Sequence, residues 1–292
     1  MSKRNSNSII AFAVVLIVVI MGLFFSQTSK HMENQKVGDG TTMTVSFLDV
    51  GQGDCELISL PDGKLMLIDS GEAEYSEKVI DTLNSYGCEK IDFLVITHPH
   101  TDHMGGMSEI INTFEIGEIY MPKVSASTRT FENLLQTIAD NSLSINTANA
   151  GKTIYSEGLI DIKLLSPCSE SYDETNNYSA VVKLTYDEKS FLFTGDAEKE
   201  AEQEMLANCY SDLDCDVLKV SHHASRYSTS SSFLSAVAPD YAVIEVGADN
   251  PYGHPHQKTL DRLNDAGVQV YRTDISGDIT FLCDGKSIQI EE

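Results

Sequence analysis

The chain has 292 residues, of which 44 are acidic and 20 basic, so its formal net charge is −24. This length is sufficient for a large hydrophobic core, in one broad domain or two small ones. The acidic excess repels phosphate backbones, and no basic stripe interrupts it. Tight nucleic-acid binding through charge is therefore not expected.

The six cysteines are scattered, with no Cys-x-x-Cys pair among them. This spacing excludes a zinc ribbon, and the cysteine density is too low for a disulfide scaffold. We expect buried free thiols. The alternative is a disulfide between Cys209 and Cys215, which are close in sequence, if the compartment is oxidising.

Near the N-terminus, Lys3 and Arg4 precede a continuous apolar run over residues 9–25. A helix of this length spans roughly 25 Å, and basic residues before it favour an N-terminus on the inside. No small-x-small cleavage site follows, so we predict a single-pass signal anchor and an extracytoplasmic domain at the cell membrane. The alternative is a cleaved signal peptide and a secreted protein. The predicted boundaries are a transmembrane helix over 1–27, a polar linker over 28–42 and a globular domain over 43–292.

The globular part alternates between short apolar segments and segments of helical periodicity. Strands are predicted over 44–48, 56–60, 65–68, 91–96, 118–121, 180–186, 190–193, 216–220, 241–245 and 269–271, with short strands between 142 and 165 and a final hairpin near 284. Helices are predicted over 76–86, 104–114, 130–139, 198–206, 233–237 and 259–266. Because strands cluster and helices intervene in both halves, we predict an α/β fold of two packed sheets with helices outside.

A cluster of three histidines and an aspartate follows the strand predicted over 91–96. Imidazole and carboxylate groups at a strand end suit zinc and similar divalent ions. His98 and His100, two residues apart on extended chain, face the same side and can share one ion. Asp102 and His103 face a neighbouring position and can hold a second ion. The alternative is a histidine-rich surface loop, but the spacing favours a site for two metal ions.

Other predicted strands also end in metal-ligand residues, namely Asp69, Asp196 and the pair His222-His223. Taken singly, each has a simpler explanation, since the aspartates can cap turns and the histidines can be ordinary loop residues. Because metal-ligand residues recur at the ends of several predicted strands, we predict that these residues meet at one edge of the two sheets.

These motifs resemble those of the metallo-β-lactamase superfamily, whose hallmark is the pattern His98-x-His100-x-Asp102-His103. More narrowly, the chain is similar to the metallo-β-lactamase domain at the C-terminal end of ComEC-family competence proteins. The phrases that carry this likeness lie at 47–54, 67–71, 177–179, 194–196, 217–223 and 250–255. The resemblance implies an αββα sandwich over 43 to about 289, and a hydrolase that uses one or two metal ions, usually zinc and sometimes manganese.

The chain departs from the superfamily pattern in three ways. Residues 104–221 contain no histidine, so one ion has fewer protein ligands, and water, Asn177 or substrate completes its shell. Ala224 stands where the ComEC-like branch commonly has glycine. We also expect no many-pass channel like that of this branch, so DNA transport is not expected to carry over.

The resemblance assigns roles to the site residues. Asp196 is expected to bridge two divalent ions, one held by His98 and His100 and the other by Asp102, His103 and one of the pair His222-His223. The predicted metal residues are His98, His100, Asp102, His103, Asp196 and His222, and the predicted catalytic residues are Asp102, His223 and Asp69. Asp69 is expected to fix a motif histidine, and the histidine of the pair that is not a ligand to protonate a leaving group. Asn177, Ser179 and His254 are predicted to contact substrate, with turn capping or loop packing as the alternatives.

The function predicted from these features is a membrane-anchored, extracytoplasmic hydrolase that uses a metal-activated water. Phosphodiesters are the favoured substrates, with DNA among them. One alternative keeps the site but changes the bond to a carboxylic ester, a lactam or a phosphorylcholine-type ester. Another is a metal-binding surface module without enzymatic activity. The expected partners are this substrate and, through the N-terminal helix, the membrane.

Overall fold

The computed structural model describes residues 40–291. The predicted anchor over 1–27 lies outside the described residues, as does the predicted linker up to residue 39. None of the helices in the described range is long and apolar enough to cross a membrane. The first strand begins at Met43, the residue at which the sequence predicts the domain to start.

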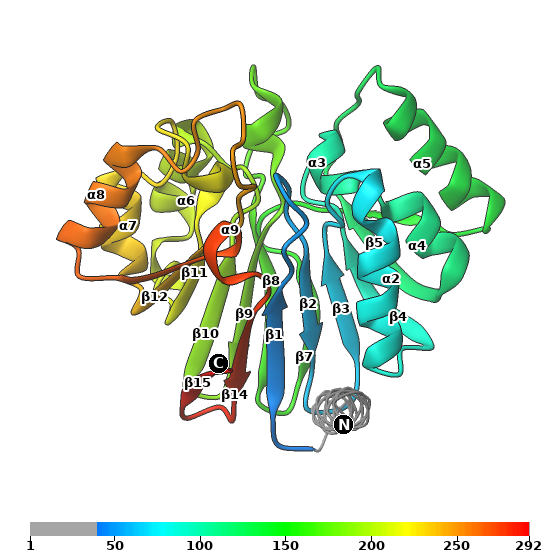
Figure 1. Cartoon of the computed structure of the whole chain (residues 1–292), viewed down its shortest axis with the longest axis horizontal. Helices are drawn as coiled ribbons and strands as arrows, with labels where there is room; N and C mark the ends of the chain where they lie inside the picture. Colours follow the sequence, from blue (N-terminus) through cyan, green and yellow to red (C-terminus); the bar gives the residue numbers. More distant parts are fainter. Residues whose placement is uncertain (1–39, 292) are drawn as a thin grey trace, which may run out of the picture.

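Two mixed sheets face each other in the middle of the domain (Figure 1). The eight-stranded sheet has the order β15-β14-β1-β2-β3-β4-β5-β6. Its strands are β15 (Ile288–Glu291), β14 (Ile279–Cys283), β1 (Met43–Phe47), β2 (Glu56–Ser59), β3 (Leu65–Ile68), β4 (Lys90–Val95), β5 (Glu115–Met121) and β6 (Ile145–Thr147). The seven-stranded sheet has the order β13-β12-β11-β10-β9-β8-β7. Its strands are β13 (Gln269–Arg272), β12 (Tyr241–Ile244), β11 (Val217–Lys219), β10 (Lys189–Phe193), β9 (Val181–Tyr186), β8 (Ile160–Ser166) and β7 (Thr153–Glu157).

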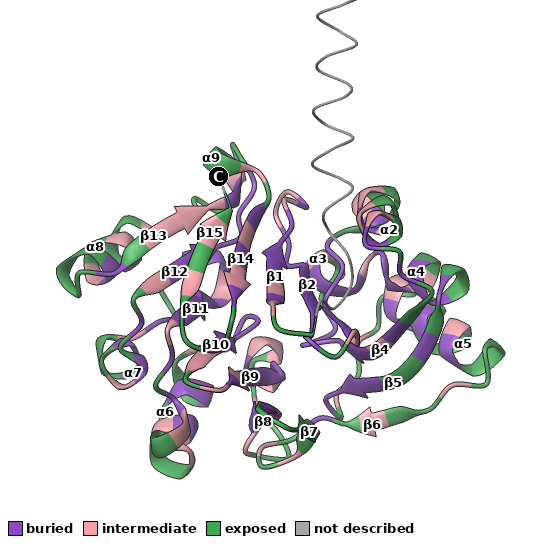
Figure 2. Cartoon of the chain, turned by 90° about the horizontal axis from the view of Figure 1, so that it is seen from below, coloured by how far each residue is buried: buried purple, intermediate pink, exposed green. Residues whose placement is uncertain are grey.

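Helices cover the outer face of each sheet (Figures 1 and 2). The first group is α2 (Ser76–Ser85), α3 (Thr101–Met104), α4 (Met107–Thr113) and α5 (Arg129–Asp140). The second group is α6 (Lys199–Asn208), α7 (Ser231–Val237) and α8 (Gln257–Asp265), whereas the short α9 (Thr273–Ser276) lies between β13 and β14 and connects the two sheets. Four 3-10 turns complete the elements within residues 40–291: η1 (Ala73–Tyr75), η2 (Thr175–Tyr178), η3 (Tyr210–Asp212) and η4 (Ser221–Ala224). The predicted arrangement of two mixed sheets flanked by helices is confirmed.

The helix predicted over 104–114 is divided into α3 and α4 by Gly105 and Gly106. A β-carbon on Gly105 would lie 2.6 Å from the backbone nitrogen of Ala73 and 2.6 Å from the carbonyl oxygen of Thr101. Glycine is therefore required here because two backbone segments touch. The division lets α3 present its side chains to the strand ends while α4 packs against the first sheet.

Strand alternation builds a core on both sides of each sheet. In β4, Phe93 and Val95 point between the sheets, whereas Leu94 and Ile96 of this segment pack under the helices. The layer between the sheets contains Phe47, whose ring centroid lies 5.9 Å from those of Phe193 and Phe281. Because successive side chains point to opposite faces of a strand, each strand contributes to two separate apolar layers.

Parallel pairing brings the ligand-bearing loops to one edge. β3 pairs in parallel with β4, and β10, β11 and β12 form a parallel set in the other sheet. The carboxyl ends of parallel strands lie at the same edge of a sheet, and the two edges meet between the layers. The residues that follow these strand ends are Asp69, His98, Asp196, Ser221 to His223, and Glu245.

Candidate metal centre

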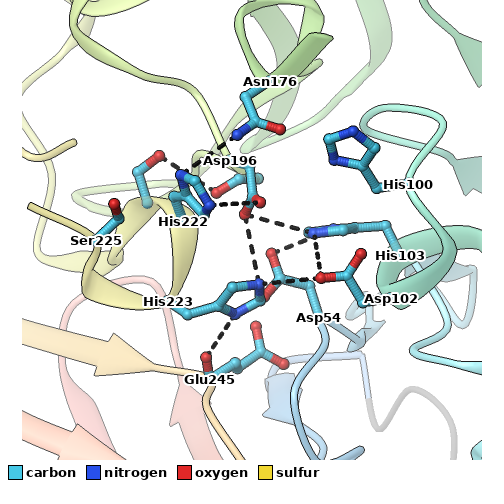
Figure 3. Close-up of polar contacts among 12 residues, drawn as sticks. Asp54, His100, Asp102, His103, Asn176, Asp196, His222, His223, Ser225 and Glu245 are labelled. Carbon is cyan, nitrogen blue, oxygen red and sulfur yellow. Dashed lines mark hydrogen bonds and ion pairs between the residues drawn. The ribbon is translucent and has the colours of Figure 1, made fainter. Parts of the chain in front are cut away.

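Asp102, His103 and His223 form a group with metal-ligand spacing, which we call the inner position, and Asp196 faces it (Figure 3). His103 Nε2 lies 3.4 Å from Asp196 Oδ1, and His223 Nε2 lies 3.7 Å from the same oxygen. Asp102 Oδ2 lies 3.6 Å from His223 Nε2 and 3.9 Å from His103 Nε2. The edge of a tetrahedron with 2.1 Å metal–nitrogen bonds is about 3.4 Å. The spacing therefore fits ligands around a shared ion.

Three of these atoms lack any hydrogen-bond partner among the described residues. They are His103 Nε2, His223 Nε2 and Asp196 Oδ1, and all three are buried. A buried polar atom without a partner carries a desolvation cost, which a cation at their common point would remove. The residues present thus fit a divalent ion at the inner position.

The two inner histidines have their other ring nitrogen already engaged. His103 Nδ1 lies 2.7 Å from Asp69 Oδ2, and His223 Nδ1 lies 2.8 Å from the carbonyl oxygen of Glu245. Because Nδ1 of each ring contacts an acceptor, Nε2 of each ring faces the inner position. Asp69, which the sequence predicts to fix a motif histidine, lies where it can do this for His103.

A second convergence, the outer position, lies on the other side of Asp196. We assign His98, His100 and His222, with Asp196 Oδ2, to this position from their pairwise contacts. Of these, His98 and Asp196 belong to a group with metal-ligand spacing, which His103 completes. Asp196 Oδ2 lies 3.8 Å from His98 Nε2 and 3.7 Å from His222 Nε2. His98 Nε2 and His100 Nδ1 are 2.9 Å apart. Asp196 thus turns one oxygen to each position, the geometry of a bridging carboxylate.

The adjacent histidines 222 and 223 face different positions because the backbone there is left-handed. The φ angles of His222, His223 and Ala224 are 52°, 51° and 62°. In extended chain neighbouring side chains would point to opposite sides, but here both rings turn towards Asp196. The structure places His223, not His222, beside Asp102 and His103. His222 instead lies at the position that the sequence left short of a histidine.

Residues not singled out in the sequence hold His222 in place. Glu198 Oε1 lies 3.0 Å from His222 Nδ1, and Asn176 Nδ2 lies 3.4 Å from the same nitrogen (Figure 3). His222 holds the pKa of the Glu198 carboxyl below its usual range through this hydrogen bond. Because Glu198 and Asn176 engage His222 Nδ1, His222 Nε2 faces Asp196. Asp69 orients the His103 ring in the same way.

The electrostatics of the site follow from burial and close opposite charges. Burial raises the pKa of Asp196, but the facing histidines, His103 first, hold it well below its usual range. Burial lowers the pKa of His103, but the surrounding carboxylates, Asp196 first, raise it well above its usual range. Metal-bound imidazole nitrogen is unprotonated, so an ion at the inner position has to displace a proton from His103.

A buried ion pair lies beneath the inner position. The Lys219 ammonium contacts Asp54 Oδ2, and both side chains are fully buried. Asp54 also lies 3.5 Å from His103 Nδ1 and 3.4 Å from His223 Nδ1. Glu245 sits nearby, and burial with the Asp54 charge raises the pKa of Glu245 to about 8. Asp54 and Lys219 belong to phrases that carry the family likeness, and that was the only sequence signal for them.

The three predicted substrate residues lie in different surroundings. Asn177 is buried, and its Oδ1 accepts the backbone N–H groups of Glu198 (3.1 Å) and Ala201 (3.3 Å), so it caps α6. Ser179 Oγ accepts the N–H of Asp196 at 3.1 Å and lies 3.5 Å from His98 Nδ1. The contacts of Asn177 therefore fit the capping alternative, and its contact with substrate stays a prediction.

His254 lies over the two adjacent histidines. Its ring centroid is 5.4 Å from that of His222 and 6.1 Å from that of His223. The half-buried ring stacks on the exposed Tyr252 on its other side, at 5.9 Å. Burial, with the charges of His223 and His222, lowers the pKa of His254 to about 4. A neutral ring at the rim is suited to contact a substrate bound at the outer position.

Comparison with known proteins adds to this geometry. The model of the family described as the metallo-beta-lactamase superfamily matches residues 48–247. The chain belongs to the metallo-β-lactamase superfamily. ComE operon protein 3 of Bacillus subtilis is 30% identical over 92% of the chain and 38% of its own length. Recombination protein 2 of Haemophilus influenzae is 31% identical over 96% of the chain and 32% of its own length. The chain thus spans about a third of the length of these ComEC-family relatives.

Solved structures support the fold. The metallo hydrolase Igni18 of Ignicoccus hospitalis superposes with a TM-score of 0.53 at 17% identity, over 82% of this chain and 99% of its own. CmlA of Streptomyces venezuelae, a diiron β-hydroxylase, also gives 0.53 at 17% identity, over 82% of this chain and 53% of its own. Superfamily membership and the His/Asp clusters together identify a metal-dependent hydrolase.

Proposed function

We propose that this metallo-β-lactamase-fold hydrolase cleaves phosphodiesters with two divalent ions, most readily zinc, and that residues 1–27 anchor it in the membrane with its domain outside. The observation that carries the proposal is the bridging geometry of Asp196. One oxygen of Asp196 faces His103 and His223, and the other faces His98 and His222. Two adjacent ions suit the two non-bridging oxygens of a phosphodiester.

The two positions differ in exposure, which sets the direction of approach. His103 and His223 are buried, whereas His100 is exposed and His222 is partly exposed. When bound, the ions supply an activated water and polarise the phosphoryl group. The chain's own residues orient these parts: Asp69 and Glu245 fix the inner rings, Glu198 fixes His222, and His254 covers the outer side. Substrate approaches from the outer position.

The net charge of −24 disfavours the binding of long nucleic acids, so the local charge of the metal centre has to offset this repulsion. The ligand set contributes two carboxylates against two divalent ions, which leaves the centre positive and attractive to one phosphate. Competence and recombination, which appear in the names of relatives, are processes that act on DNA. Short or single-stranded DNA is therefore the first nucleic acid to test.

The test is hydrolysis by the purified full chain loaded with zinc or manganese. We expect turnover of bis-p-nitrophenyl phosphate and of a short single-stranded DNA, with none for Asp196→Asn. Asp261→Asn, at an exposed helix position, serves as the matched control and should behave as wild type. Turnover of p-nitrophenyl acetate, a lactam or p-nitrophenylphosphorylcholine, with neither phosphodiester cleaved, would replace this substrate class by another. Metal binding without hydrolysis of any of these would favour a non-enzymatic module.

The anchoring proposal rests on the apolar run over 9–25 and on Lys3 and Arg4 before it. Protease added to intact cells that express the full chain should remove the domain and leave a short membrane-bound fragment. A domain that is digested only after the cells are lysed would contradict an outside location. A domain recovered from the medium without residues 1–27 would show cleavage and secretion.

A further inference from the structure

Two thiols that are far apart in sequence share one acceptor on the second sheet. Cys168 Sγ donates to the carbonyl oxygen of Leu165 at 3.4 Å, and Cys209 Sγ donates to the same oxygen at 3.6 Å. Because both sulfurs contact one oxygen, at 3.4 Å and 3.6 Å, they are at most about 7 Å apart. Cys215, the neighbour of Cys209 in sequence, is turned away and donates to the carbonyl oxygen of Val217. In the fold, therefore, Cys168 is the better placed partner for Cys209, although Cys215 is nearer in sequence.

Cys168 and Cys209 are accessible as well as close. Each is partly exposed, whereas the other four cysteines are buried. Cys168 lines a surface cavity of about 370 Å³, together with Ser169 and Tyr178. The pair therefore lies at the surface and outside the apolar core.

The two cysteines lie at the same end of two segments that run along each other. Cys209 follows the last residue of α6, and Cys168 opens residues 168–178, which we call the α6 strap. Within the strap, the hydroxyls of Ser169 and Tyr172 both donate to the carboxylate of Glu204 in the middle of α6. At the far end Asn177 caps the N-terminus of α6. The strap is thus fastened to α6 at the middle and at the N-terminal end by hydrogen bonds, with the two thiols at the C-terminal end.

The strap also reaches the metal centre. Asn176, at its far end, contacts both His222 Nδ1 (3.4 Å) and Glu198 Oε1 (3.1 Å). Glu198 is the N-cap residue of α6 and holds His222 from the other side. Whatever fixes the strap against α6 therefore fixes the support of His222.

We propose that Cys168 and Cys209 form a disulfide that holds the α6 strap on α6 and steadies the support of His222. In this step each thiol loses its hydrogen and one S–S bond forms. The two electrons and two protons pass to a small-molecule disulfide such as oxidised glutathione, which leaves as two thiols. Burial raises the pKa of Cys168 to about 12, so its thiolate is scarce in the folded chain. The bond therefore forms during folding, when both thiols are exposed.

The experiment is refolding of the full chain from denaturant with and without oxidised and reduced glutathione, followed by non-reducing peptide mapping. Cleavage before Asp212 separates Cys209 from Cys215, so each pairing gives a distinct linked peptide. We expect the Cys168–Cys209 peptide and a mass lower by two hydrogens. Cys215→Ala and Cys88→Ser are the matched controls and should keep the linkage, whereas Cys168→Ser and Cys209→Ser should lose it. A Cys209–Cys215 peptide, or six free thiols in the correctly folded chain, would overturn the proposal.

Two physical readouts test the steadying role. The loop closed by the bond has about 40 residues, so oxidation should raise Tm by about 5–15 °C in wild type and leave it unchanged in Cys168→Ser. Backbone hydrogen exchange over residues 168–178 should slow by about tenfold on oxidation. A linked chain whose strap exchanges at the reduced rate would show that the bond does not steady the strap, contrary to the proposal.

Discussion

Asp69 Oδ2 lies 2.7 Å from His103 Nδ1, and both side chains are fully buried. The other carboxylate oxygen of Asp69 accepts the backbone N–H of Thr97 at 2.8 Å. Asp69 thus joins the end of β3 to the loop after β4 and fixes both the tautomer and the direction of the His103 ring. It supports the inner position without contacting its centre.

This contact predicts the effect of Asp69→Asn, which keeps the shape of the side chain and removes its charge. Loss of an outer carboxylate on a ligating histidine reduces metal affinity by about 10–100-fold. Competition with a chromogenic zinc chelator measures this change. Asp92→Asn, whose carboxylate accepts the N–H of Leu65 away from the site, should leave the affinity unchanged. Equal affinity for wild type and Asp69→Asn would refute the positioning role.

The buried pair of Asp54 and Lys219 predicts a large loss of stability for Asp54→Asn. An unpaired buried ammonium costs about 3–5 kcal/mol. Urea unfolding in metal-free buffer measures this loss, and adding Lys219→Met should restore part of it because the uncompensated charge is gone. Asp212→Asn breaks a partly exposed pair with Lys163 and should cost only about 0–1 kcal/mol. A loss for Asp54→Asn as small as that of the control would rule out a structural ion pair.

The tight backbone contact at Gly105 predicts that Gly105→Ala is destabilising. The added β-carbon would lie 2.6 Å from backbone atoms that cannot move independently, and overpacking costs about 1–3 kcal/mol. Gly106→Ala is the matched control, since its nearest contact would be 3.2 Å. Denaturant unfolding should rank Gly105→Ala well below Gly106→Ala. The reverse order would show that the division between α3 and α4 does not depend on this contact.

His254 predicts how stability depends on pH at the acidic side. Its folded pKa of about 4 lies below the ordinary value of 6.5. Between these values the unfolded chain binds a proton and the folded chain does not, so stability falls as pH drops from 6.5 to about 4 and this contribution is constant below. His254→Gln should lose less stability than wild type over that interval, measured as the unfolding midpoint. Parallel curves for the two proteins would contradict the assignment.

The sequence predicts those parts of the fold and site that depend on local pattern. The strand before His98 is a continuous apolar run, and ligand residues at the ends of parallel strands meet at one edge whatever the rest of the chain does. The spacing of His98, His100, Asp102 and His103 therefore indicated two positions before their geometry was known. The two mixed sheets followed from the same alternation of strands and helices.

The remaining features depend on long-range contacts or on backbone conformation. Asp54 and Lys219 are 165 residues apart, and no local pattern marks two charged residues as a buried pair. The directions of His222 and His223 depend on three consecutive left-handed residues, a run that is uncommon for residues other than glycine and that no local pattern marks. The side-chain amide of Asn177 could either cap a helix or bind a substrate, and the sequence alone does not distinguish the two roles. The position of α6 in the fold favours the cap.

Anomalous diffraction from crystals of the domain soaked in zinc would locate the metal ions and show whether Asp196 lies between two of them. We predict two peaks that share Asp196. One peak should lie among Asp102, His103 and His223, and the other among His98, His100 and His222. A single peak, or a second one that His222 does not approach, would contradict the two-ion centre described here.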